Sequence, residues 1–291
     1  MTEQSAGARP AVILVGTPIG NLGDISPRAV EALTDADVIA AEDTRRTRPM
    51  LTALGIPAGG RLVSFHGPRE AELAAKLVAR IVERGERLVC VTDAGMPGIS
   101  DPGERLVTAA LAAGVAVEVV PGPSAALAAL VVSGLPTARF VFEGFLPRKG
   151  RQRAARLAEL KGEERTVVLF EAPHRLEATV ADLAAALGPD RPVAVAREIT
   201  KRFETVWRGT LGQAASDEGP EARGEQVIVL GPAPPSVSGE PDDEEIEGAL
   251  RNELAAGAST RDAAAVVANR LGVTRRRAYA LANSLRGSAR P

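Results

Sequence analysis

Thr92-Asp-Ala-Gly-Met-Pro-Gly-Ile-Ser-Asp-Pro-Gly103 follows the pattern of a buried strand, Arg87–Val91, and precedes a helical pattern that starts near Glu104. Its glycines permit positive φ angles and close backbone approach, and its prolines fix φ and remove a hydrogen-bond donor. Open α/β sheets bind their ligands at loops that leave the carboxyl ends of strands. Because this loop is long and carries two carboxylates, the sequence favours a binding loop over a plain structural turn.

Short apolar segments and amphipathic helical segments alternate on both sides of this loop. The alternation predicts an α/β protein with two α/β domains, whose first sheet is mostly parallel and whose second sheet is mixed. The expected strands of the first sheet are Ala11–Val15, Asp37–Ala41, Leu62–Phe65, Leu88–Val91 and Val115–Val120, and those of the second are Phe140–Glu143, Thr166–Phe170, Val193–Ala196, Glu204–Arg208 and Gln226–Leu230. The helices expected between them include Arg69–Arg84 and Pro102–Ala113.

Changes in composition divide the chain into five parts. We expect a disordered leader at 1–10, an N-terminal α/β domain at 11–121, a C-terminal α/β domain at 122–232, a linker at 233–244 and a basic helical module at 245–291. Pro121–Ser124 is the expected hinge between the two α/β domains, and prolines and acidic residues mark the linker.

The end of the chain has the pattern of a helix-turn-helix. Ser259 and Thr274 are expected to cap two helices that a turn at 272–274 separates. Residues 259–291 contain seven arginines and one acid, which favours contact with nucleic acid. A helical dimerisation tail is the alternative interpretation.

Charge and cysteine content limit the classes of function. The 291 residues carry a formal net charge of −2, so any contact with nucleic acid must come from local basic patches. A single cysteine excludes an intrachain disulfide, and with only two histidines we expect no Cys/His metal site. The sequence shows neither a membrane-spanning apolar run nor the apolar core of a signal peptide, so we expect a cytoplasmic protein that does not bind membranes.

The first loop, Val15–Asp24, invites comparison with dinucleotide-binding loops. Its glycines at 16, 20 and 23 lack the required spacing, and Pro18 stands where the backbone would approach a pyrophosphate. Glu42 and Asp43 fall where such folds place a ribose-binding acid, but this match is weak without the glycine pattern. A tight β–α turn and a loop for another small molecule remain the two interpretations.

Six segments together resemble one known family. They are Leu14–Ile25, Ala41–Arg45, Thr92–Gly103, Val120–Ser124, Glu171–Arg175 and Ala196–Lys201, and they occur in this order. Over residues 10–285 the chain is similar to the bacterial small-subunit ribosomal RNA methyltransferases I, of the tetrapyrrole-methylase superfamily. The resemblance implies a homodimeric enzyme that transfers a methyl group from S-adenosylmethionine to the ribose 2′-hydroxyl of a cytidine in the decoding region of 16S rRNA. It also implies two α/β domains with the cofactor in the cleft between them.

The resemblance assigns the cofactor to three loops and one aromatic side chain. The implied contacts are Pro18, Ile19, Asp93, Gly95, Met96, Pro97, Ser124, Ala125 and Phe170. The second half of the 92–103 loop is interpreted as the structural start of the next helix. Phe170 has the alternative role of an ordinary core residue.

The implied reaction also requires the removal of a proton, because a ribose hydroxyl ionises far above neutral pH. The candidate catalytic residues are Glu42, Asp43, Glu171, His174, Glu198 and Lys201. The choice of general base among them stays open, as does catalysis by orientation of donor and acceptor alone. His174 has the alternative role of a structural helix-start residue, and Glu198 and Lys201 that of a surface ion-pair cluster.

Basic residues supply the candidate RNA contacts. They are Arg45, Arg148, Lys149, Arg151, Arg175, Arg197, Arg275, Arg276 and Arg277. The run that follows Pro147 has the alternative role of a solvated helix face. The expected partner is 16S rRNA or the small ribosomal subunit.

Two other functions fit parts of the sequence. A tetrapyrrole or diphthine methylase would share the scaffold, but a small tetrapyrrole needs no basic helix-turn-helix tail. A DNA-binding regulator would use the tail to bind DNA and the α/β body to sense an effector.

Overall fold

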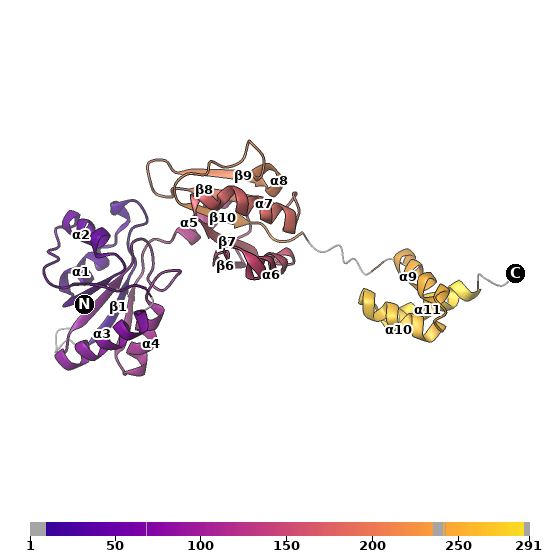
Figure 1. Cartoon of the computed structure of the whole chain (residues 1–291), viewed down its shortest axis with the longest axis horizontal. Helices are drawn as coiled ribbons and strands as arrows, with labels where there is room; N and C mark the ends of the chain where they lie inside the picture. The colour runs from indigo at the N-terminus through magenta and orange to yellow at the C-terminus, as the bar shows by residue number, and fades with distance from the viewer. Residues whose placement is uncertain (1–9, 68, 235–240, 242, 288–291) are drawn as a thin grey trace. The chain divides into compact units, whose positions relative to one another are not determined.

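The computed structural model describes residues 10–67, 69–234, 241 and 243–287 (Figure 1). The chain divides into two compact units, Met1–Pro232 and Ala233–Pro291. Residues 1–9 of the leader predicted at 1–10 and most of the linker predicted at 233–244 lie outside the described residues. The first unit contains both sheets, so the expected domain boundary at 121/122 falls inside it and stays a prediction.

The first sheet has five strands, all parallel, in the order β3-β2-β4-β1-β5. Its strands are β1 (Ala11–Val15), β2 (Val38–Ala41), β3 (Leu62–Ser64), β4 (Arg87–Val91) and β5 (Ala116–Val120). Its helices are η1 (Leu22–Asp24), α1 (Pro27–Asp35), α2 (Thr44–Ala53), α3 (Glu70–Arg84) and α4 (Glu104–Ala112). The parallel sheet is confirmed, and each of its strands lies within one residue of the predicted bounds.

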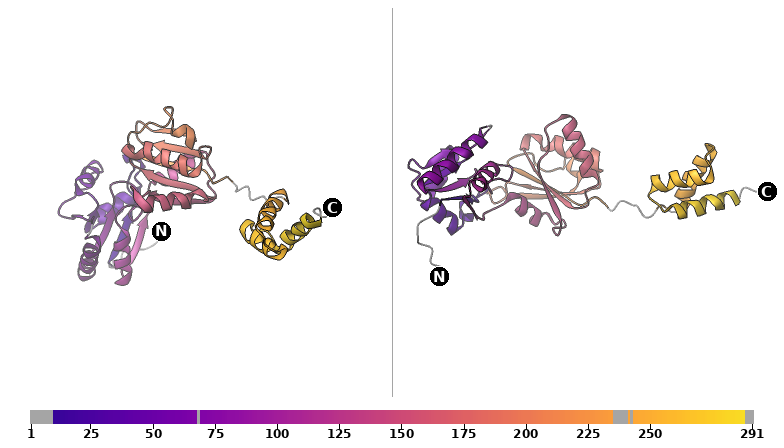
Figure 2. Two further views of the ribbon diagram at one scale, coloured as in Figure 1. Left: turned by 45° about the vertical axis from the view of Figure 1, so that its right-hand side comes forward. Right: turned by 90° about the horizontal axis from the view of Figure 1, so that it is seen from below.

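Helices cover both faces of this sheet, as Figure 2 shows from two further sides. On one face α1 and α2 pack Leu33 and Leu51 against Ile13. On the other face α3 and α4 pack Val78 and Leu106 against Val12. Successive strand residues point to opposite faces, so a strand covered on both sides requires an unbroken apolar run. For this reason the central strands β1 and β2, and residues 88–91 of β4, could be predicted from the sequence.

The helix after the 92–103 loop begins at Glu104 and not at the predicted Pro102. Gly103 has a φ of 148°, which is not helical. A Cβ on Gly103 would come within 2.7 Å of the Gly98 nitrogen, and that nitrogen donates to the Pro102 carbonyl at 3.1 Å. The loop therefore folds back on itself before the helix starts.

The second sheet has the order β6-β7-β10-β8-β9. Its strands are β6 (Phe140–Phe145), β7 (Thr166–Glu171), β8 (Pro192–Arg197), β9 (Thr205–Thr210) and β10 (Gln226–Leu230). β6 and β7 are parallel and the other pairs are antiparallel, which confirms the mixed sheet. α5 (Ala125–Ser133) packs on one face, and α6 (Gly150–Lys161), α7 (Leu176–Leu187) and α8 (Leu211–Ala214) pack on the other. β6 runs two residues past its predicted end, through an irregularity between Phe142 and Gly144.

The described part of the second unit consists of α9 (Asp243–Ala255), α10 (Thr260–Leu271) and α11 (Arg275–Gly287). The side chains of Ser259 and Thr274 accept backbone hydrogen bonds at the starts of α10 and α11, which confirms both predicted caps. α9 adds Ile246 and Leu250 to the core of this unit. None of the described helices combines the length and the hydropathy required to cross a bilayer.

Candidate active site

Three loops of the first sheet meet at the carboxyl ends of its parallel strands. Gly16 directly follows β1, and Gly122 is separated from the end of β5 by Pro121. The two glycine backbones are in contact, since a Cβ on Gly16 would come within 2.7 Å of the Gly122 Cα. The same Cβ would also come within 2.7 Å of the Met96 sulfur, which belongs to the loop after β4. The structure therefore brings together the three loops that the resemblance assigned to the cofactor.

Thr17 holds the first of these loops against the 92–97 segment. Its backbone N–H donates to the Gly95 carbonyl at 2.9 Å, and the Gly95 N–H donates back at 3.2 Å. The buried Thr17 hydroxyl donates to the Thr92 carbonyl at 3.2 Å. Gly95 has a φ of 84°, a value that favours glycine. Pro18 and Ile19 therefore follow a residue, Thr17, that these hydrogen bonds hold in place. The side chain of Ile19 is buried.

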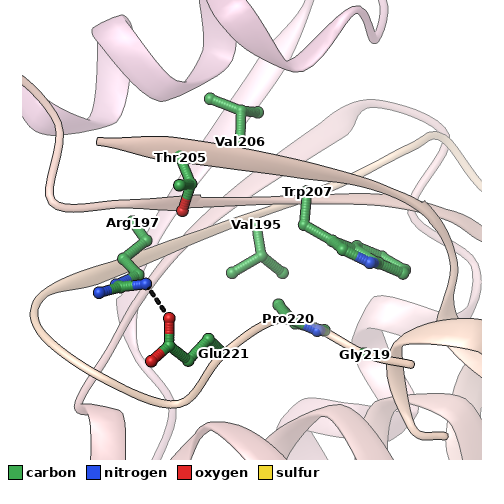
Figure 3. A pocket seen from close by; sticks show the side chains of 8 residues that line it. All are labelled: Val195, Arg197, Thr205, Val206, Trp207, Gly219, Pro220 and Glu221. Atoms are coloured by element: carbon green, nitrogen blue, oxygen red, sulfur yellow. Dashed lines mark hydrogen bonds and ion pairs between the residues drawn. The ribbon is translucent and has the colours of Figure 1, made fainter. Parts of the chain in front are cut away.

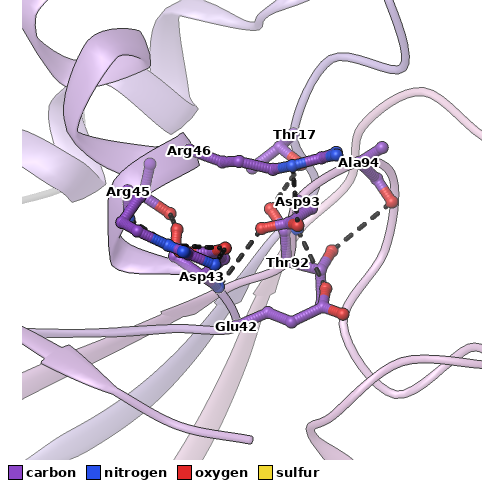
Figure 4. Close-up of polar contacts among 9 residues, drawn as sticks. Thr17, Glu42, Asp43, Arg45, Arg46, Thr92, Asp93 and Ala94 are labelled. Atoms are coloured by element: carbon purple, nitrogen blue, oxygen red, sulfur yellow. Dashed lines mark hydrogen bonds and ion pairs between the residues drawn. The ribbon is translucent and has the colours of Figure 1, made fainter.

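Acidic residues after β2 and β4 tie the next two loops together (Figure 4). The Glu42 carboxylate accepts from the Asp93 backbone N–H at 3.1 Å, and the Asp93 carboxylate accepts from the Asp43 N–H at 3.2 Å. Arg46 forms an ion pair with Asp93 at 3.4 Å. Hydrogen bonds from Arg45 lower the pKa of Asp43 to about 2, so Asp43 stays ionised at neutral pH.

Asp101, in the second half of the 92–103 loop, lies close enough to Glu42 and Asp93 for their negative charges to affect its pKa. Burial raises the pKa of Asp101 to about 6, and the negative charges of Glu42 and Asp93 contribute to the rise. A carboxyl group that titrates near neutral pH is suited to accept a proton in catalysis. Asp101 thus has a chemical property that the sequence interpretation of this half-loop as purely structural did not foresee.

A turn after β8 brings charged residues of the second sheet to the first loop. A Cβ on Gly20 would overlap the side chain of Lys201 and come within 3.0 Å of the Thr200 hydroxyl. Lys201 Nζ donates to Glu198 and to Glu225, each at 2.9 Å. Glu198 and Thr200 have φ values of 51° and 69°, which are uncommon for residues with side chains and concentrate at functional sites.

These ion pairs determine the protonation state of Lys201. Burial lowers the pKa of Lys201, but the hydrogen bonds to Glu225 and Glu198 outweigh it, so the pKa is raised. The Glu225 backbone N–H and the Lys201 ammonium both donate to the Glu198 carboxylate and lower the pKa of Glu198. Lys201 is therefore an ammonium at neutral pH, which suits it to hold an anion and not to accept a proton.

Glu171 is buried at the end of β7, and both of its carboxylate oxygens have partners. They accept hydrogen bonds from the Thr179 hydroxyl at 2.6 Å and the Ala172 N–H at 2.9 Å, and Arg175 forms an ion pair at 3.2 Å. These contacts suit Glu171 and Arg175 to hold the start of α7 and the short helix η2 (Pro173–Arg175). His174 lies between them in sequence and is exposed.

Phe170 forms edge-to-face contacts with Phe142 and Phe145, with ring centroids 5.0 and 5.7 Å apart. Phe145 is 52% exposed, so this aromatic cluster extends to the surface. At the start of α5 the Ser124 hydroxyl accepts a backbone hydrogen bond, and Ala125 is the first residue of the helix. Both positions follow the loop that contains Gly122.

The candidate RNA contacts fall into two groups. Arg148 and Lys149 are exposed between β6 and α6, Arg151 is exposed in the first turn of α6, and Arg275 and Arg276 are exposed at the start of α11. The others form ion pairs: Arg45 with Asp43, Arg175 with Glu171, Arg197 with Glu221 and Arg277 with Asp243.

Several residues of this region are absent from the sequence prediction. They are Gly16, Thr17, Arg46, Asp101, Gly122, Thr200 and Glu225. Gly16 could have been found from the sequence because it directly follows the apolar strand β1, and Gly122 because it lies in the Pro121–Ser124 segment expected to be the hinge. The rest depend on pairing between distant loops, such as the Asp43–Asp93 contact across 50 residues, which no local pattern reveals.

Comparison with known proteins defines the class first. Residues 11–215 match the family described as Tetrapyrrole (Corrin/Porphyrin) Methylases. Among solved structures, the fold is similar to that of a uroporphyrin-III-C-methyltransferase from Thermus thermophilus, with a TM-score of 0.53 and 25% identity over 77% of this chain and 94% of that one. A diphthine synthase has the same fold, with a TM-score of 0.58 and 18% identity over 76% of this chain and 90% of that one.

Curated relatives define the family within this class. A protein of Synechocystis sp. named "Ribosomal RNA small subunit methyltransferase I" is 44% identical over 94% of this chain and 97% of its own length. Proteins with the same name from Xylella fastidiosa and Mycobacterium tuberculosis are 51% and 50% identical over 75% and 77% of this chain, and 80% and 78% of their own lengths. The chain therefore belongs to the ribosomal RNA small subunit methyltransferase I family of tetrapyrrole methylases.

Proposed function

We propose that this chain transfers the methyl group of S-adenosylmethionine to the ribose 2′-hydroxyl of a cytidine in the decoding region of 16S rRNA. The observation that carries the proposal is the 44% identity, over 94% of the chain, to a relative named for methyl transfer to small-subunit ribosomal RNA. Loops of the first sheet and a charged turn of the second meet beside Gly20, which supports a site formed by both sheets.

S-adenosylmethionine supplies, when bound, a methyl group on a positively charged sulfur. The residues at the sheet edge fit such a ligand. The Thr200 hydroxyl, beside Gly20, is buried without a hydrogen-bond partner among the described residues, which is expected of a group that contacts a ligand. A solved structure similar to this chain, at 25% identity, is of a uroporphyrin-III C-methyltransferase complexed with S-adenosyl homocysteine. We assign the cofactor to Pro18, Ile19, Asp93, Gly95, Met96, Pro97, Ser124, Ala125 and Phe170.

The protein's part in the reaction is to orient the acceptor and to receive its proton. An enzyme that holds two reactants in the correct orientation removes much of the entropy cost of bringing them together. Glu42, Asp43, His174 and Glu198 remain the proposed groups at the acceptor, and Asp101 joins them because its pKa is about 6. Lys201, as an ammonium, holds a phosphate in this proposal, and Glu171 positions the segment that carries His174.

The exposed cations of both units bind the RNA backbone in this account. Arg148, Lys149 and Arg151 are proposed to contact phosphates near the site, and Arg275 and Arg276 to contact them from the second unit. The other candidate arginines are paired with carboxylates and must exchange these for phosphates before they can bind the RNA backbone. They are Arg45, Arg175, Arg197 and Arg277. The assembled small subunit is the proposed substrate.

A homodimer is part of the proposal. Leu127 and Val131 lie one turn apart on α5 and are 50% and 73% exposed, and apolar side chains grouped on an exposed surface mark association sites. A second copy of the chain is the proposed occupant. Light scattering should give twice the chain mass, and Val131→Glu should shift the protein toward the monomer; a monomer before substitution would contradict this part.

Incubation with tritiated S-adenosylmethionine and unmodified small ribosomal subunits tests the function. We expect label in 16S rRNA and none in a tetrapyrrole or a diphthine precursor. Label in either small substrate, but not in subunits, would favour a methylase of the same scaffold. Sequence-specific DNA binding by the tail without methyl transfer would favour a regulator.

A further inference from the structure

A hollow of about 290 Å³ on the second sheet takes no part in the proposed methyl transfer, although Arg197 at its edge is one of the candidate RNA contacts (Figure 3). Its walls come from β8, β9 and the segment 219–221. Figure 3 shows the indole of Trp207 at one end and the Arg197–Glu221 ion pair at the other, with Val195 and Pro220 between them.

Trp207 is a fixed wall of this hollow. Its indole N–H donates to the Glu218 carbonyl at 3.2 Å, and its ring packs against the core that contains Val195. Since the indole donor already has a partner, the ring offers a ligand mainly its apolar surface. A flat aromatic ligand is the natural partner of such a surface.

The other end of the hollow is polar but electrically balanced. Arg197 pairs with Glu221, and Arg197 Nε is buried without a hydrogen-bond partner among the described residues. A buried donor without an acceptor is unfavourable, so a ligand acceptor here would be stabilising. Because the ion pair is neutral as a whole, this end favours a neutral ligand with hydrogen-bonding edges over a phosphate, a carboxylate or a purely apolar group.

We propose that this hollow binds an unpaired nucleobase of the RNA substrate. The inference rests on the proposed function, which makes RNA the macromolecule that the enzyme meets. Nucleobases are neutral and planar, carry donors and acceptors on their edges, and stack on aromatic side chains. Arg197 ends β8 and precedes the turn that contacts Gly20, so the hollow lies next to the proposed site of methyl transfer. A base held here fixes the register of the RNA strand at that site.

The sequence supplies a direct probe, because Trp207 is the only tryptophan. Titration of the full-length protein with a short single-stranded RNA should quench its tryptophan fluorescence. The same RNA in a perfect duplex, an abasic strand of the same length and inorganic phosphate should not. Equal quenching by the abasic strand or by phosphate would contradict a base pocket.

Variants separate the pocket from its surroundings. Trp207→Ala should weaken binding of a dye-labelled single strand about 10-fold, in the range measured for loss of one stacked base, and Trp207→Phe should weaken it less. Glu221→Gln should weaken binding several-fold, whereas Glu218→Gln, an exposed control on the same segment whose carbonyl and not its carboxylate meets the indole, should not. If Glu221→Gln instead tightened binding, the region would be a phosphate groove and the proposal would be wrong.

Methyl transfer to small subunits is measured on the same variants, so that failure of the base pocket can be told apart from failure of the proposed function. Quenching by single strands without any methyl transfer would leave the base pocket standing and overturn the function. If the unsubstituted protein shows no quenching, and Trp207→Phe and Glu221→Gln transfer methyl groups with wild-type kcat/KM, the function stands and the pocket is overturned. Unchanged circular dichroism in Glu221→Gln shows that its fold is intact.

Discussion

The backbones of Gly16 and Gly122 lie so close together that a Cβ on Gly122 would come within 2.6 Å of the Gly16 carbonyl oxygen. Neither neighbour is a flexible side chain that could move aside, so a larger residue at either position must displace a strand end. The contact joins the loops after β1 and β5, and Met96 of the third loop packs against it. This junction is the structural basis for assigning the cofactor to these loops.

Gly122→Ala should therefore destabilise the first unit by about 1–3 kcal/mol, the usual cost of overpacking, and should weaken S-adenosylmethionine binding. Urea unfolding measures the first effect and calorimetry the second. Gly60→Ala is the matched control, since no atom lies within 4 Å of its added Cβ. Equal stability of the two variants would show that the close approach imposes no constraint.

Asp93→Ala should abolish S-adenosylmethionine binding and leave the fold intact. The substitution removes the acceptor for the Asp43 N–H and the partner of Arg46, and with them the carboxylate assigned to the cofactor. Calorimetric titration gives the affinity, and Asp35→Ala, at an exposed helix end, is the control. Unchanged affinity would remove the 92–97 loop from the cofactor site.

Asp101→Asn should make stability less dependent on pH. The folded-state pKa of about 6 lies above the ordinary value of 3.8, so the folded protein retains a proton that the unfolded chain loses between these values. Asp101 therefore contributes a loss of stability as pH rises from about 4 to 6. Melting curves should show Asp101→Asn to be more stable than the parent at about pH 7 and similar below about pH 4. A constant difference at all pH values would contradict the raised pKa.

Cys90 should be inert in the folded protein. Burial raises the pKa of its thiol to about 12, with contributions from Glu70 and Glu42, and the thiol is the less reactive form. A colorimetric thiol reagent should react in urea and not under native conditions. Reaction at the same rate in both conditions would show that β4 is accessible.

Neutralising Arg148, Lys149 and Arg151 together with glutamine should weaken binding to small subunits and lower its salt dependence. Each lost phosphate contact reduces the slope of log K against log salt by about 0.7–0.9. Filter binding over a salt series measures the slope, and Arg28→Gln, exposed at the start of α1, is the control. An unchanged slope would show that these three side chains do not contact phosphates.

The strands of the first sheet could be predicted to within one residue because they depend on local patterns, whereas the assignment of the cofactor to three loops came from the resemblance and stays a proposal. β1 and residues 88–91 of β4 are unbroken apolar runs, and glycine and proline in the 92–103 loop interrupt the alternation of strands and helices. The ion pair of Lys201 with Glu198 was among the alternatives that the sequence offered. Thr179 as a partner of Glu171 and Glu225 as a partner of Lys201 were not predictable, because they reach these residues only after the second sheet is assembled. The effect of the Glu42 charge on the pKa of Asp101 likewise depends on how the loops pack, and the spacing of these residues in the sequence does not predict it.

The position of the methyl group on the RNA tests the central claim most directly. Small subunits labelled by this protein from tritiated S-adenosylmethionine are to be hydrolysed with alkali, which cleaves RNA only where the 2′-hydroxyl is unmodified. The account predicts that the label is recovered in one alkali-resistant dinucleotide with cytidine on its 5′ side. Recovery of the label in mononucleotides would place the methyl group on a base and contradict ribose methylation.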